Sequence, residues 1–201
     1  MNGTEAASQL GEVVALAVNA ALFRRDAFAV VAANPAAASA ALWIPFLAGV
    51  SELVGQSYVL AKRRIGRVRA LASLVLTGLV HVTAVVIWAC ACFVFLELDH
   101  LGSEPLLALL GAVSLGYSPR LLGLFTIAPF YGELLGRMLD AWAMACVGWG
   151  LWIVTHEPMA PVLFCAALGW LASFLARRFG GLAMAPLLRL AGLVSPGLRR
   201  V

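Results

Sequence analysis

The amino-acid sequence predicts an all-α, polytopic membrane helix bundle with about five transmembrane helices. Hydrophobic residues make up 63% of the 201 residues and charged residues only 12%, whereas soluble domains have roughly 45–50% apolar and about 25% charged residues. Residues 70–96 contain no Asp, Glu, Lys or Arg. A helix of that length reaches about 40 Å, more than the roughly 30 Å of a hydrocarbon core. These observations argue against a soluble globular domain.

Short connections separate the apolar segments, so we expect one transmembrane domain, residues 37–176. Before it, residues 1–36 mix small apolar residues with charges and contain no uncharged run long enough to span, which predicts an interfacial helix. After it, residues 177–201 space five arginines among leucines, which fits either a basic amphipathic tail on an anionic surface or a frayed, solvated one. The expected membrane segments are residues 38–61, 70–96, 105–131, 138–155 and 159–176.

The distribution of Lys and Arg predicts the topology. The connections 97–104 and 156–158 contain no Lys or Arg, so they are expected to face away from the cytoplasm. Under this assignment the first segment either crosses fully, which puts the N-terminus outside, or enters and leaves on one side; we favour the crossing. The cytoplasmic basic loop, expected to contact anionic lipid, contains Lys62, Arg63, Arg64, Arg67 and Arg69.

Four polar residues are expected near the middle of the membrane. Counted from the cytoplasmic ends at about 1.5 Å per residue, Glu52, His81 and Arg120 all lie about 15–18 Å deep. Ionisable groups at that depth normally face the bundle interior and pair with one another. We therefore expect an ion pair of Glu52 with Arg120, with His81 and Gln56 as hydrogen-bond partners. This cluster is either a structural polar clamp, which we favour, or a proton or ion path.

The third apolar segment is expected to break in its middle. Pro119 removes one backbone donor and blocks the carbonyl four residues earlier, which predicts half-helices over 105–115 and 119–131. Broken helices at this depth occur in transporters, although neighbouring side chains also satisfy the freed backbone groups. The residues of the break are Gly116, Tyr117, Ser118 and Pro119.

A cytoplasmic turn is expected between the third and fourth segments. Glu133 and Arg137 are spaced i,i+4, and Arg137 and Asp140 i,i+3, which predicts a small surface network on one helix. The tryptophans of this region are expected to serve packing and the interfacial belt. The turn comprises Pro129, Gly132, Glu133, Arg137, Asp140 and Trp142.

The sequence contains no motif that predicts catalysis. It has no Walker loop and no H-E-x-x-H, and the serine of "GAVSLG" misses the G-x-S-x-G spacing. The four cysteines lie in apolar stretches without C-x-x-C spacing and are expected to pack as small residues. We therefore expect no enzyme, no cofactor and no metal site. The net charge of +4 reflects membrane topology rather than nucleic-acid binding.

Three stretches, "GVSELVGQSYVLAKRR", "LGYSPRLLGLFTI" and "APFYGELLGRMLDAW", resemble bacterial, cyanobacterial-like members of the Yip family of Rab-GTPase-interacting-protein-like membrane proteins. The resemblance covers about residues 27–176. It implies a compact five-helix membrane domain without catalytic activity, whose eukaryotic members act as trafficking adaptors. The structural positions that it assigns are Gly116, Tyr117, Pro119, Pro129 and Trp142.

Two functions from different classes follow. The first is a non-enzymatic membrane scaffold or accessory subunit that contacts other membrane proteins or copies of itself, in the inner or a thylakoid-type membrane of a bacterium. The alternative is a small solute, ion or proton-coupled transporter that uses the midplane polar cluster.

Overall fold

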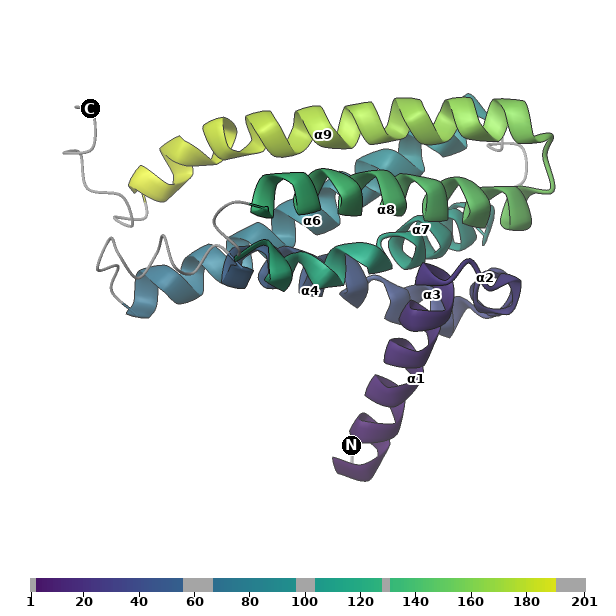
Figure 1. The fold of residues 1–201 in the computed structure, drawn as a ribbon, viewed down its shortest axis with the longest axis horizontal. Helices are drawn as coiled ribbons and strands as arrows, with labels where there is room; N and C mark the ends of the chain where they lie inside the picture. Colours follow the sequence, from purple (N-terminus) through teal and green to yellow (C-terminus); the bar gives the residue numbers. More distant parts are fainter. Residues whose placement is uncertain (1–2, 56–66, 97–103, 128–130, 191–201) are drawn as a thin grey trace.

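A computed structural model describes the backbone of residues 3–55, 67–96, 104–127 and 131–190, and the side chains of 11–55, 71–96, 106–127 and 131–175. Within these ranges all regular secondary structure is helical, which confirms the predicted all-α class. Helices α4, α6, α7, α8 and α9 lie along a common direction, whereas α1 points away from them (Figure 1). The elements are α1 (Gly3–Ala21), α2 (Arg25–Ala33), α3 (Pro35–Ala41), α4 (Trp43–Gly55), α6 (Arg67–Phe95), α7 (Glu104–Gly116), η2 (Ser118–Ile127), α8 (Gly132–Thr155) and α9 (Met159–Leu190).

Four stretches of the described chain are long and apolar enough to cross a membrane: Pro35–Gly55, Leu71–Phe95, Leu106–Ile127 and Gly132–Thr155. The fifth predicted segment coincides with the shorter apolar helix Met159–Leu175, the first part of α9. The fold is thus a polytopic membrane helix bundle, as predicted. Helix α9 continues to Leu190, so the first part of the predicted tail is helical, and residues 191–201 lie outside the described residues.

The first membrane stretch consists of two consecutive helices, α3 and α4. Asn34 begins α3 by accepting a hydrogen bond at its side-chain oxygen from the backbone N–H of Ala36 (2.9 Å), and Pro35 follows at a position where its missing donor costs nothing. A turn at Leu42 separates the two helices. The stretch therefore begins at Pro35, three residues before the predicted start, and its predicted last part, 56–61, lies outside the described residues.

Part of the N-terminal segment, predicted to be interfacial, belongs to the buried core. Phe28 and Val31 of α2 are 0% and 1% exposed. A Cβ atom added to Gly150 of α8 would lie 2.5 Å from Cδ1 of Phe28, so only glycine admits that ring. Helix α2 is thereby fixed to α8, while α1 extends outward from the same region (Figure 1).

The third membrane stretch breaks as predicted. Helix α7 ends at Gly116, and η2, a ten-residue 3₁₀-helix, begins at Ser118. The second half was expected to be α-helical; instead the N–H of Arg120 bonds to the carbonyl of Tyr117 at i,i−3 spacing (3.0 Å). Runs of 3₁₀-helix this long are uncommon because their hydrogen-bond geometry is poor. Tertiary contacts must therefore support η2.

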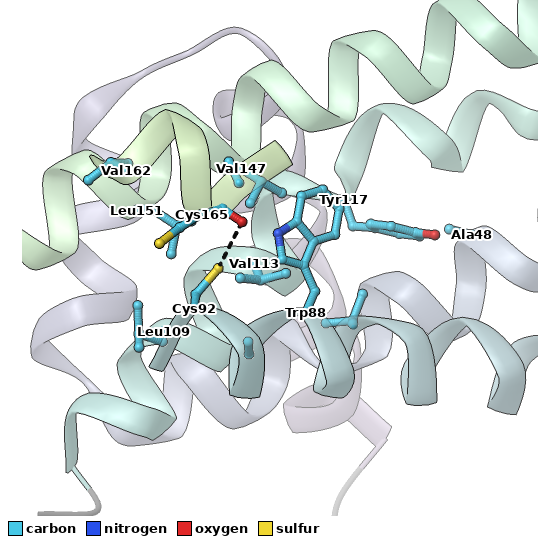
Figure 2. Packing of buried hydrophobic residues seen from close by; sticks show 13 residues of the cluster. Ala48, Trp88, Cys92, Leu109, Val113, Tyr117, Val147, Leu151, Val162 and Cys165 are labelled. Atoms are coloured by element: carbon cyan, nitrogen blue, oxygen red, sulfur yellow. Dashed lines mark hydrogen bonds between the residues drawn. The ribbon is translucent and has the colours of Figure 1, made fainter. Parts of the chain in front are cut away.

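The main core lies between α6, α7, α8 and α9. Trp88 and Tyr117 are each 1% exposed, and Figure 2 shows Tyr117 extending toward Ala48 of α4. Three of the four cysteines are buried; Cys92 contacts the carbonyl of Cys165 through its thiol at 3.7 Å (Figure 2). Close packing around Tyr117 brings the broken stretch against α4 and α6.

Candidate functional site

An ionic network in the bundle interior joins four ionisable residues from four different elements. Arg120 of η2 donates from Nη1 to Oε2 of Glu52 on α4 at 2.8 Å. Its Nη2 donates to Oδ1 of Asp140 on α8. The carboxylate of Glu52 also lies 3.2 Å from Nε2 of His81 on α6. We call these four residues the ionic network. It connects segments that are up to 88 positions apart in the chain, from Glu52 to Asp140.

The two basic members are more buried than the two acidic ones. The side chains of His81 and Arg120 are 5% and 9% exposed, and those of Glu52 and Asp140 are 33% and 24% exposed. A buried guanidinium is strongly destabilising without carboxylate partners, because it loses its hydration. Arg120 has two such partners, so the network stabilises the one arrangement of helices in which both carboxylates reach it.

Small residues allow α4 to approach both of its neighbours. A Cβ atom at Gly49 would lie 2.7 Å from Nδ1 of His81, and one at Gly123 would lie 3.1 Å from Cα of Glu52. Any larger side chain at either position would separate the backbones that carry the network. The two glycines therefore position Glu52 between α6 and η2.

The imidazole of His81 faces a hydrogen-bond acceptor at each nitrogen. Its Nδ1 lies 2.9 Å from the backbone carbonyl oxygen of Thr77, which can only accept, so Nδ1 carries a hydrogen. Its Nε2 faces the carboxylate of Glu52. This second contact is a hydrogen bond only if Nε2 or the carboxyl group also carries a proton. Glu52 thus faces both His81 and Arg120 in the bundle interior.

Tyr117, at the break, contributes its ring to the network. The guanidinium carbon of Arg120 lies 5.4 Å from the centre of the Tyr117 ring, a cation–π distance. The same ring meets His81 edge to face, with centres 6.0 Å apart. Ser118, also at the break, donates to the carbonyl of Leu115, whereas the Tyr117 hydroxyl has no hydrogen-bond partner among the described residues.

Ser51 supports the backbone of η2. Its hydroxyl donates to the carbonyl of Leu121 at 2.7 Å and accepts from the N–H of Leu124 at 2.9 Å. One side chain on α4 thus satisfies two backbone groups of a segment with poor internal hydrogen bonds. The sequence analysis did not identify Ser51. Its position directly before Glu52, which was expected to face this segment, was the available signal.

The ion-pair partner predicted for Asp140 from the sequence is wrong. We expected it to pair with Arg137 on the helix surface, but it pairs with Arg120, and Arg137 pairs with Glu133 at i,i+4 spacing. Positions 120 and 140 lie equally far from residue 130, in the connection between two antiparallel stretches. Residues equally far from the connection of two antiparallel stretches lie at the same level, so this spacing could have indicated that the two side chains meet. Reasoning from one helix alone missed it.

The remaining predicted site residues lie apart from the network or outside the described residues. Trp142 donates from Nε1 to the carbonyl of Ala21 at the end of α1 (3.0 Å). Gly132 begins α8, directly after the turn. Arg67 and Arg69 lie in the first turn of α6, and their side chains are not described. The residues outside the described ranges are Gln56, Lys62, Arg63, Arg64 and Pro129.

The chemistry of the network is that of ion pairing and hydrogen bonding. The carboxylates of Glu52 and Asp140 accept hydrogen bonds from Arg120, and the imidazole of His81 faces the carboxylate of Glu52. In the described part of the chain, no group of three or more His, Cys, Asp or Glu residues is placed to hold a metal ion. Comparison of the chain with protein-family models, curated proteins and solved structures finds no match.

Proposed function

We propose that this chain is a non-enzymatic integral membrane protein that serves as a scaffold or accessory subunit of a membrane assembly. The observation that carries the proposal is the binding of Arg120 by both Glu52 and Asp140. A guanidinium shared by two carboxylates on different helices sets the register of those helices, because a shift of either helix would leave a buried charge without its partner. A bundle locked in this way presents a constant surface to partners.

The packing around the network supports the same role. A Cβ atom at Gly116 would lie 2.7 Å from the backbone nitrogen of Val147, and one at Gly55 would lie 2.5 Å from the carbonyl oxygen of Gly123. Such backbone contacts leave little room for the sliding or rocking by which transporters alternate access. In membranes, where lipid is as apolar as the helices, close contact of small residues is a main source of helix association.

We assign the chain to the Yip type on the motifs "GYSPR" and "PFYG", and to the inner or a thylakoid-type membrane of a bacterium. Its partners would be other membrane proteins or further copies of the chain. Anionic lipid would bind at the basic loop of residues 62–69, since each Lys or Arg near such a surface contributes about 1 kcal/mol of binding.

The scaffold role is tested by purifying the full chain from its native membrane in a mild detergent and measuring the mass of the intact assembly. We expect a defined complex of fixed stoichiometry that is larger than one chain of 21.2 kDa. The matched variant Arg120→Met should yield less of this complex, whereas Arg137→Met, which removes a surface pair, should not change it. A chain that remains a monomer at every concentration would contradict the scaffold role.

One observation favours the transporter as a second candidate. Glu52, which lies 3.2 Å from Nε2 of His81, has a side chain that is one-third exposed. Reconstituted vesicles with an internal pH indicator distinguish the two functions. The scaffold predicts proton flux equal to that of empty vesicles. The transporter predicts flux that Glu52→Gln abolishes and Glu133→Gln, a surface control, leaves unchanged.

A further inference from the structure

Both ring nitrogens of His81 lie next to hydrogen-bond acceptors. Nδ1 lies 2.9 Å from the backbone carbonyl oxygen of Thr77, and Nε2 lies 3.2 Å from Oε2 of Glu52. A neutral imidazole has one N–H and one lone pair, so it can donate to only one of these oxygens. At the other nitrogen a lone pair would face an oxygen lone pair at hydrogen-bond distance. One further proton, on the ring or on the carboxyl group, converts the second contact into a hydrogen bond.

The packing around His81 holds the ring against both acceptors. A Cβ atom added to Gly49 of α4 would lie 2.7 Å from Nδ1 and 2.8 Å from the carbonyl oxygen of Thr77, so the backbone of α4 closes that side of the contact. The ring of Tyr117 meets the imidazole edge to face, with centres 6.0 Å apart. The His81 side chain is 5% exposed. Water therefore has little access to the ring nitrogens, and an unsatisfied lone pair there carries the penalty of a buried polar group.

The charges of the ionic network favour the same additional proton. Arg120 of η2 donates to Oε2 of Glu52 at 2.8 Å, which favours the ionised carboxylate and so places the proton on the imidazole. The second carboxylate, that of Asp140 on α8, binds the other terminal nitrogen of Arg120. With a proton on the imidazole, the four members of the network have two positive and two negative charges. Without it the two carboxylates outnumber the guanidinium, and such an imbalance is disfavoured in a membrane interior.

The other titratable groups on the helices packed against α6 lie away from His81. These helices are α4, α7 and α9. In the described part of α4, Glu52 is the only ionisable side chain. The described part of α9 has only Cys165, which contacts α6 three turns from His81. Glu104 is the first residue of the 13-residue helix α7, about 18 Å from its last. Tyr117, directly after α7, presents its ring to His81 and extends toward α4 (Figure 2). The contact of His81 with Glu52 is thus the place where a proton can be bound.

We propose that His81 and Glu52 form a proton-binding site, in which the bound proton joins α6 to α4. When the site is occupied, the pair carries two protons: one on Nδ1, donated to Thr77, and one between Nε2 and Oε2 of Glu52. Loss of the second proton leaves two acceptors facing each other, which weakens the contact of the two helices. This inference goes beyond the scaffold role, because it concerns a ligand of the ionic network and not its protein partners.

Nuclear magnetic resonance can count these protons directly. The full chain is reconstituted in lipid bilayers with isotope-labelled histidine, and the signals of His81 are identified by their loss in His81→Gln. We expect both nitrogens of His81 to carry a proton at neutral pH. A protonated Glu52 carboxyl group, detected in the carbon spectrum beside a singly protonated His81, would equally show an occupied site. A singly protonated His81 beside an ionised Glu52 would overturn the proposal.

Glu52→Gln gives the matched comparison. The amide of glutamine has N–H donors of its own and can donate to Nε2, so the second proton is no longer required. His81 should then carry a proton on Nδ1 alone. In the control Glu133→Gln, which removes the exposed pair of Glu133 with Arg137, His81 should keep both protons. A second proton retained on His81 in Glu52→Gln would show that Glu52 does not hold it, and would overturn the site.

Spin labels measure whether the proton joins the two helices. The labels are attached to Leu47→Cys on α4 and Leu79→Cys on α6, which are 40% and 48% exposed, in a chain whose exposed Cys90 is replaced by serine. As the pH is raised, the distribution of distances between the labels should broaden at the pH at which the second proton is lost. With Glu52→Gln added it should stay narrow, because the amide donates without a titrating proton. An unchanged distribution after loss of the proton would refute the coupling.

The proton site and the scaffold role can fail separately. A singly protonated His81 beside an ionised Glu52, in a chain that still forms a stoichiometric membrane complex, would refute the site and leave the scaffold role in place. An occupied site in a chain that remains a monomer would support the site and refute the scaffold. An occupied site in vesicles that show proton flux dependent on Glu52 would support the site and favour the transporter.

Discussion

The guanidinium of Arg120 donates a hydrogen bond to the carboxylate of Glu52 at 2.8 Å, although the two residues lie 68 positions apart. The pair joins the 3₁₀-helix after the break to the end of the first membrane stretch. Because Asp140 binds the other terminal nitrogen of the guanidinium, one side chain connects three separate elements. The strength of this connection can be measured.

Replacing Arg120 should destabilise the bundle far more than replacing the exposed Arg137. Arg120→Met removes the cation that Glu52 and Asp140 share; because these two side chains are 33% and 24% exposed, we expect a loss of about 1–3 kcal/mol, less than for a fully buried pair. Arg137→Met removes an i,i+4 surface pair worth about 0.3–0.5 kcal/mol. The measurement is the free energy of unfolding in detergent, followed by tryptophan fluorescence.

The partners of Arg120 provide the control for this experiment. If the loss arises because the two carboxylates no longer share the Arg120 cation, Arg120→Met/Glu52→Gln/Asp140→Asn should be more stable than Arg120→Met alone, because neutral amides cost less to bury. Equal stability of Arg120→Met and Arg137→Met would refute the clamp.

Two glycines, one closely packed and one with open space around it, should respond to alanine in opposite directions. A Cβ atom at Gly116 would lie 2.7 Å from the backbone of Val147, so Gly116→Ala should destabilise the fold by about 1–3 kcal/mol. An added Cβ atom at Gly136, within α8, would meet nothing within 4 Å beyond its own stretch of helix, so Gly136→Ala should stabilise the helix by about 0.5–1 kcal/mol. The measurement is the thermal unfolding midpoint of each variant relative to the unmodified chain. A shift of both midpoints in the same direction would contradict this prediction.

Removing the hydroxyl of Ser51 should weaken η2. Ser51→Ala leaves the carbonyl of Leu121 and the N–H of Leu124 without this partner, which we expect to cost about 1–3 kcal/mol. Thr83→Ala is the matched control, because the Thr83 hydroxyl is exposed and donates to the carbonyl of Leu79 in its own helix. Hydrogen exchange of the Leu124 amide should accelerate in Ser51→Ala alone; unchanged exchange would show that η2 does not depend on Ser51.

The N-terminal helices should prove necessary to the core. Phe28→Ala removes a fully buried ring that packs on Gly150, for which we expect a loss of about 3–5 kcal/mol. Val30, on the same helix, is 44% exposed, so Val30→Ala should change stability by less than about 0.5 kcal/mol. The measurement is the free energy of unfolding of both variants in the same detergent. If Phe28→Ala were as stable as Val30→Ala, α2 would not contribute to the stability of the core.

Much of the fold could be predicted from composition and local chemistry. The apolar runs predict membrane helices because the thickness of the hydrocarbon core sets their length, and Pro119 predicts the break because its ring lacks a donor. Depth counting likewise indicated that Glu52, His81 and Arg120 share one level, since residues on straight helices rise by a constant amount.

Only the tertiary structure decided which groups at that level meet. Asp140 reaches Arg120 because α8 packs against η2. The spacing of Asp140 and Arg137 along one helix does not predict this contact between two elements. Two backbone groups of η2 are bonded by Ser51 of another element, and the burial of Phe28 depends on the absence of a side chain at Gly150. The sequence by itself thus determined which segments are apolar and where the chain breaks, because these are properties of neighbouring residues. The ionic network and the direction of α1 arise from contacts between distant segments, and packing alone selects those.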